Sequence, residues 1–82
     1  MVTVKASGAL RSALDNVESV EVVAETIKEL LERLTDRYPR LAQELENSMV
    51  AVAINGDIYR DDWRVPIPEG SEVFLIPRIQ GG

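Results

Sequence analysis

The strongest hydrophobic pattern in the chain lies in "TIKELLERLTDRYP", residues 26–39. Four apolar residues recur there at i, i+3, i+4 and i+7: Ile27, Leu30, Leu31 and Leu34. This spacing places them on one face of an α-helix. Thr26 and Glu29 have the spacing of a capping box at its start, and Pro39 predicts a stop or kink after Tyr38. The following "RLAQELEN" predicts a second, shorter helical segment.

Two segments before this helix predict strands, because apolar and polar residues alternate in them. They are "MVTVK", with Val2 and Val4 on one face, and "SVEVVA", with Val20 and Val22 on one face. Two such strands joined by a loop indicate a hairpin. The intervening "ALRSALDN" has room for a helical turn.

Three further strands are expected after the helices. In "VAVAI", residues 50–54, one face carries large apolar residues and the other carries alanines. Asn55-Gly56 is the preferred dipeptide of a tight hairpin turn, so a short strand should return through Ile58 and Tyr59. A turn at "PEG", residues 68–70, then leads into "SEVFLIP".

The last strand carries four consecutive apolar residues, which indicates a strand that is covered on both faces or one whose second face meets a partner. We assign Val73 and Leu75 to the core under the helix. Phe74 and Ile76 then lie on the open face of the sheet together with Ile58, where an apolar patch would be a partner-docking surface. The alternative is that both faces are buried within the monomer.

The order of these elements predicts an α+β fold, with one main helix packed across a mixed sheet of four to five strands. The first and last strands are the most apolar and are expected side by side at the centre. This is the β-grasp arrangement of ubiquitin. Residues 1–77 would form this single domain, and residues 78–82 a flexible C-terminal tail.

The amino-acid composition limits the kinds of functional site and partner that the chain could have. The 82 residues include no cysteine and no histidine, so disulfides, thiolate nucleophiles and almost every zinc site are excluded, and no metal is expected. The net charge of −5 disfavours nucleic-acid binding and would suit a partner with a basic surface. No apolar run approaches the length of a membrane span, and the start shows no signal-peptide pattern, so a cytoplasmic protein is expected.

Four residues near the last turn need separate interpretation. Asp61, Asp62 and Glu69 are expected to form a solvated acidic surface, because no further ligand type accompanies them for metal binding or acid–base catalysis. Trp63, the only tryptophan, is expected in a loop folded over the sheet edge, with a partner anchor as the alternative.

The chain ends in "IPRIQGG", and glycine is the residue that loses most conformational freedom when it is fixed. Together with "LRSAL", "TIKELLERLTDRYPRLAQEL", "VAVAINGDIY" and "IPEGSEVFLIPRIQGG", this ending resembles the ubiquitin-like sulfur carriers of the MoaD and ThiS family, with most similarity to MoaD, the small subunit of molybdopterin synthase. The resemblance covers nearly the whole chain.

The resemblance implies that the Gly82 carboxylate is chemically used. An adenylating enzyme of the MoeB type would join it to AMP from ATP, and a sulfur donor such as a cysteine desulfurase or rhodanese would then lead to a thiocarboxylate. A large subunit of the MoaE type would use that sulfur to build the dithiolene of molybdopterin. The chain itself would bind no cofactor and would be a carrier, not an enzyme.

The tail residues follow from the same resemblance. Gly81, Gln80, Ile79 and Arg78 would enter the active site of the partner, where Arg78 would meet a carboxylate. A narrow glycine arm suits this task, since its ordering is deferred until a partner binds.

Two other functions use the same residues differently. A protein modifier would form isopeptide bonds from Gly82 to lysines, and a carrier for thiamine or cysteine biosynthesis would deliver the same sulfur elsewhere. A third possibility is a β-grasp binding module with an incidental tail.

Overall fold

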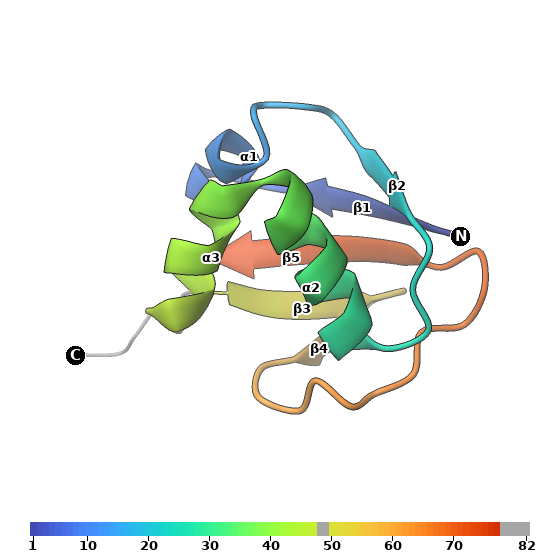
Figure 1. Ribbon diagram of the computed structural model, residues 1–82. Helices are drawn as coiled ribbons and strands as arrows, with labels where there is room; N and C mark the ends of the chain where they lie inside the picture. Colours follow the sequence, from blue (N-terminus) through green and yellow to red (C-terminus); the bar gives the residue numbers. More distant parts are fainter. Residues whose placement is uncertain (48–49, 78–82) are drawn as a thin grey trace.

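The computed structural model describes residues 1–47 and 50–77. Its elements are β1 (Val2–Ala6), α1 (Ala9–Ala13), β2 (Val20–Val22), α2 (Ile27–Arg37), α3 (Pro39–Glu46), β3 (Val50–Ile54), β4 (Asp57–Tyr59) and β5 (Glu72–Pro77). The strands form one sheet in the order β2-β1-β5-β3-β4. The helices α2 and α3 lie across one face of this sheet (Figure 1). The predicted α+β, β-grasp architecture is confirmed.

The first and last strands pair at the centre of the sheet, as predicted. β1 and β5 are parallel, with register pairs running from Thr3↔Glu72 to Ala6↔Leu75. All other strand pairs are antiparallel, so the sheet is mixed. β5 is therefore covered along both edges, by β1 and by β3. Its inward-facing Val73 and Leu75 are fully buried, which confirms their assignment to the core.

The main helix begins and ends where its sequence indicates. The backbone N–H of Glu29 donates to Thr26 Oγ1 at 3.2 Å. The Glu29 carboxylate accepts from the N–H of Glu25, one residue before the expected capping-box partner, at 2.9 Å. The four apolar residues of its inner face are all buried: Ile27, Leu30, Leu31 and Leu34. Tyr38 separates α2 from α3, and Pro39 occupies the first turn of α3, where a missing N–H costs nothing.

The predicted N-terminal hairpin is present, with Val2 opposite Val22 and Val4 opposite Val20. The helical turn expected between its strands is the short helix α1. Leu10 and Leu14 anchor α1 to the core, since each is only 1% exposed. Figure 1 shows α1 close to α3, at the end of the sheet toward which β5 runs.

The loop between β4 and β5 runs alongside the start of α2. Lys28 N–H donates to the Trp63 carbonyl at 2.7 Å, and Ile67 N–H donates to the Glu25 carbonyl at 2.8 Å. Trp63, predicted in a loop folded over the sheet edge, does lie in a loop, where it is partly buried against the core beside the start of α2. Among the described residues, no helix is both long and apolar enough to cross a membrane.

The cap of α2 gives a stability prediction. Replacing Thr26 by Ala removes the side-chain acceptor for an N–H of the first turn, which should lower the free energy of unfolding by about 1 kcal/mol. Urea unfolding of the wild type and the variant would measure this. Thr35→Ala is the matched control, because the exposed Thr35 hydroxyl donates to the Glu32 carbonyl of its own helix and caps no helix end. Its loss should change stability by less than about 0.5 kcal/mol. Equal midpoints for Thr26→Ala and wild type would contradict the capping role.

Candidate functional site

The face of the sheet turned away from the helices carries a row of apolar side chains. Strand register places Phe74 of β5 opposite Ala53 of β3, and Ala53 opposite Ile58 of β4. The next row of the same face pairs Ile76 with Ala51. The three residues predicted for a docking surface therefore do lie on one face, although they come from two strands that are not neighbours. We call Phe74, Ile76, Ile58, Ala51 and Ala53 the open-face patch.

The side chains of the open-face patch differ in how far they are exposed. Ile58 is 56% exposed and Phe74 is 37% exposed, whereas Ile76 is half-buried. The alternative in which both sheet faces are buried within the monomer is therefore wrong for Phe74 and Ile58. Ala51 and Ala53 are buried, because they are short side chains between longer ones on the adjacent strands. They form the floor of the patch, and the small-residue face of "VAVAI" was the sequence signal for it.

Polar residues that the sequence did not single out border the patch on the β1 side. Lys5 lies opposite Phe74 in the β1–β5 register, and its Nζ is 3.6 Å from Glu72 Oε2. A shallow groove beside Phe74 is lined by Lys5, Ala6, Arg11, Glu18 and Ser19. Together with Phe74, the residues of this groove come from four separate segments, so their sequence spacing could not have grouped them.

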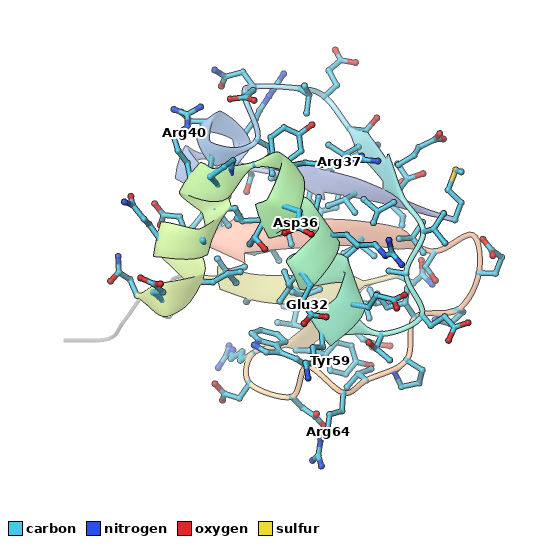
Figure 2. The ribbon with its side chains drawn as sticks, in the orientation of Figure 1. Glu32, Asp36, Arg37, Arg40, Tyr59 and Arg64 are labelled. Atoms are coloured by element: carbon cyan, nitrogen blue, oxygen red, sulfur yellow. The ribbon has the colours of Figure 1, made fainter. Side chains whose placement is uncertain are left out.

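Helix α2 carries charged side chains on the side of the domain opposite the open-face patch (Figure 2). Glu32 and Asp36 project from the face of α2 turned away from the sheet (Figure 2). Both line a polar groove with Glu29 and Arg33, and Arg33 pairs with Glu29. The eleven residues of α2 include three acidic and three basic side chains, so the net negative charge predicted to suit a basic partner is not concentrated on this helix.

The acidic residues near the last turn are exposed, as predicted. Asp62 accepts from the Arg64 N–H at 3.0 Å, and Glu69 pairs with the α-amino group of Met1. Within residues 1–47 and 50–77, no group of three or more Asp and Glu residues is arranged to hold a metal ion. The interpretation of Asp61, Asp62 and Glu69 as a solvated acidic surface agrees with these positions.

β5 is followed directly in the sequence by the predicted C-terminal tail. Pro77 is its last residue and lies opposite Val50 in the β3 register. The predicted tail residues Arg78, Ile79, Gln80, Gly81 and Gly82 lie outside the described residues. The open-face patch and the point where the tail begins therefore share one strand, since Phe74 and Ile76 precede Pro77 in β5.

Comparisons with known proteins agree on one family. The family model of the ThiS family matches residues 4–82. A chain in the crystal structure of the Amycolatopsis orientalis BexX/CysO complex superposes with a TM-score of 0.81, at 22% identity and with 100% of both chains covered. No curated protein matches the sequence.

Two solved structures are more similar in sequence. Small archaeal modifier protein 1 from Methanosarcina acetivorans is 25% identical, with a TM-score of 0.79 over 99% of this chain and 95% of that one. A chain in the complex of subunits 1 and 2 of molybdopterin-converting factor from Helicobacter pylori is also 25% identical, with a TM-score of 0.68 over 99% and 97%. The family match confirms the resemblance drawn from the sequence: the chain belongs to the ThiS family, a family of ubiquitin-like sulfur carriers and modifiers.

Proposed function

We propose that this protein is a sulfur carrier whose Gly82 carboxylate is adenylated and converted to a thiocarboxylate, and that the sulfur is used for dithiolene formation in molybdopterin biosynthesis. The observation that carries this proposal is the extent of the family match, which continues through residue 82 and so includes the Gly-Gly ending. The exposed open-face patch on the strand that leads into the tail supports it, because a carrier needs a surface by which partners hold it.

The chemistry begins with activation. A carboxylate oxygen of Gly82 attacks the α-phosphorus of ATP, pyrophosphate leaves, and an acyl adenylate forms. The sulfur of a donor persulfide then attacks the acyl carbon and AMP leaves. A thiol finally cleaves the resulting acyl disulfide by forming a disulfide with the donor, and the thiocarboxylate remains on Gly82. AMP is a far better leaving group than an oxide ion, which is why activation must come first.

In this proposal the chain contributes the reacting carboxylate and its position, and the partners supply the catalytic groups. The chain has no histidine or cysteine for proton transfer or covalent catalysis. The lack of cysteine also removes any internal thiol that could attack the acyl adenylate. The proposal therefore requires an adenylating enzyme of the MoeB type, which uses the ATP, and a sulfur donor such as a cysteine desulfurase or rhodanese.

The choice of molybdopterin rests on the Helicobacter pylori relative. That relative is solved as a protein–protein complex of the two subunits of molybdopterin-converting factor. At 25% identity over 99% of this chain, it supports a large subunit of the MoaE type as the partner that receives the sulfur.

A protein modifier is the second candidate. Its specific support is the equal identity, 25%, to small archaeal modifier protein 1. Activation of Gly82 would be the same, but a lysine amine would attack the acyl adenylate in place of sulfur and form an isopeptide bond. Carriers for cysteine or thiamine biosynthesis differ only in the molecule that receives the sulfur.

Intact mass spectrometry tests the proposal. The purified protein is incubated with ATP, the adenylating enzyme of its own organism, a cysteine desulfurase and cysteine. We expect a mass increase equal to the difference between one sulfur and one oxygen, located on Gly82 by fragmentation. The chain lacking Gly81 and Gly82 is the control and should stay unchanged.

The outcomes separate the candidate functions. Conjugates larger by a whole protein or more would favour the modifier. An unchanged wild-type mass under these conditions, with the enzyme proved active on another carrier, would contradict both.

The open-face patch gives a second prediction. Phe74→Ser should weaken binding to the adenylating enzyme about tenfold or more, because a central exposed aromatic residue contributes strongly to protein interfaces. Calorimetric titration would measure the dissociation constant. Val23→Ser is the matched control: Val23 is 60% exposed and lies just beyond β2, outside the patch. Equal affinities for wild type and Phe74→Ser would show that the patch is not the docking surface.

A further inference from the structure

The sheet has two free edges, and the hydrogen-bond pattern shows which backbone groups face them. β4 forms one edge and β2 forms the other. Asn55 N–H donates to the Glu72 carbonyl of β5 at 3.0 Å. Successive strand residues direct their N–H and C=O groups to opposite sides. The preceding residue, Ile54, therefore bonds toward β4, where its partner is Asp57.

Ile58 is the residue of β4 whose backbone faces the free edge. Its neighbours Asp57 and Tyr59 are both paired with residues of β3, and they direct their N–H and C=O groups toward that strand. The N–H and C=O groups of Ile58 therefore point the other way, out of the sheet. Among the described residues, neither group has a hydrogen-bond partner.

The edge formed by β2 differs from the β4 edge, because its outward acceptor has a partner. Thr3 N–H donates to the Ser71 carbonyl, just before β5, at 3.1 Å. Glu21 lies opposite Thr3, so its backbone faces outward. The Glu21 carbonyl accepts from Arg37 Nη1 of α2 at 3.2 Å. In the part of the chain that the structure describes, only the β4 edge thus leaves both outward groups of its central residue unpaired.

The side chains at the β4 edge indicate what kind of segment would fit there. Ile58 is an exposed member of the open-face patch, so its apolar surface and its outward backbone groups lie together. Arg60 follows β4 directly, is exposed, and forms no ion pair with any described residue. An extended peptide supplies N–H and C=O groups at the spacing of a strand. A fitting segment would also bring an apolar side chain to Ile58 and an acidic one to Arg60.

We propose that the β4 edge accepts an extended segment of the adenylating partner, which adds to the five-stranded sheet beside Ile58. This inference rests on the proposed function, in which that partner covers the open-face patch. A partner that covers the Ile58 side chain also removes water from the Ile58 N–H and C=O groups. Buried backbone groups without partners cost free energy, and pairing with a strand satisfies both groups at once. Because β4 has only three residues, the expected pairing is one donor and one acceptor bond at Ile58.

Hydrogen exchange tests the proposal without reference to activity. The protein is diluted into heavy water alone or in complex with the purified adenylating enzyme of its own organism. Mass spectrometry with electron-transfer fragmentation then locates the exchange at single amides. We expect the Ile58 amide to exchange rapidly in the free protein and at least about tenfold more slowly in the complex. The outward amide of Glu21 is the matched control and should exchange at the same rate in both.

A chemically synthesised chain removes the same donor. The α-hydroxy-acid analogue of isoleucine at residue 58 replaces the amide by an ester, which deletes the outward N–H and keeps the side chain. The matched control carries the corresponding ester at residue 21, and each ester weakens the preceding carbonyl as an acceptor to the same degree. In calorimetric titration with the adenylating enzyme, we expect the dissociation constant to rise about fivefold for the ester at residue 58 and less than about twofold for the control.

The outcomes distinguish this inference from the proposed function. Rapid exchange of the Ile58 amide within the complex, or equal affinities of the two ester chains, would overturn the inference alone. Slow exchange in the free protein that depends on its concentration would show that a second copy of the chain occupies the edge instead. A wild-type chain that does not bind the adenylating enzyme would overturn the proposed function and this inference together.

Discussion

The parallel pairing of β1 with β5 is the constraint on which the rest of this structure depends. It joins the two ends of the domain, with Ala6 opposite Leu75, across most of the sequence. Parallel strands require a long crossover connection, and here the helices α2 and α3 lie within it and cover one face of the sheet. The pairing also brings the C-terminal ends of both strands to one end of the sheet, where Gly8 lies near Pro77.

The two faces of β5 have different surroundings: one is buried and the other is partly exposed. Val73 and Leu75 are buried under the helices, and their packing contributes the hydrophobic stabilisation of the central strand. Phe74 points to the other face, where only the small side chains of β3 lie between it and Ile58. An apolar row of this kind is costly to leave in water, and that cost becomes binding free energy when a partner covers it. One strand thus contributes to the core on one face and to the open-face patch on the other, and it ends at Pro77.

The charge distribution refines what the net charge of −5 implies. Glu32 and Asp36 lie on the outer side of α2, away from the open-face patch (Figure 2). Under the proposed function, a partner that docked on the patch would meet apolar side chains bordered by Lys5 and Arg11, with Glu18 and Glu72 close by. Net charge describes the molecule at long range, whereas docking depends on the charges that surround the contact.

The sequence by itself determined the local elements and the family. The signals that could be interpreted all lie between residues close together in the chain, where local backbone preferences and side-chain spacing decide the structure. They are the helical spacing from Ile27 to Leu34, the alternation in the strands, the turn at Asn55-Gly56 and the Gly-Gly ending. Tertiary structure decided what depends on residues far apart. It made the alanines of β3 the floor of an exposed patch, and it brought Lys5 and Arg11 beside Phe74. Such contacts follow from strand order and register, which no local spacing encodes.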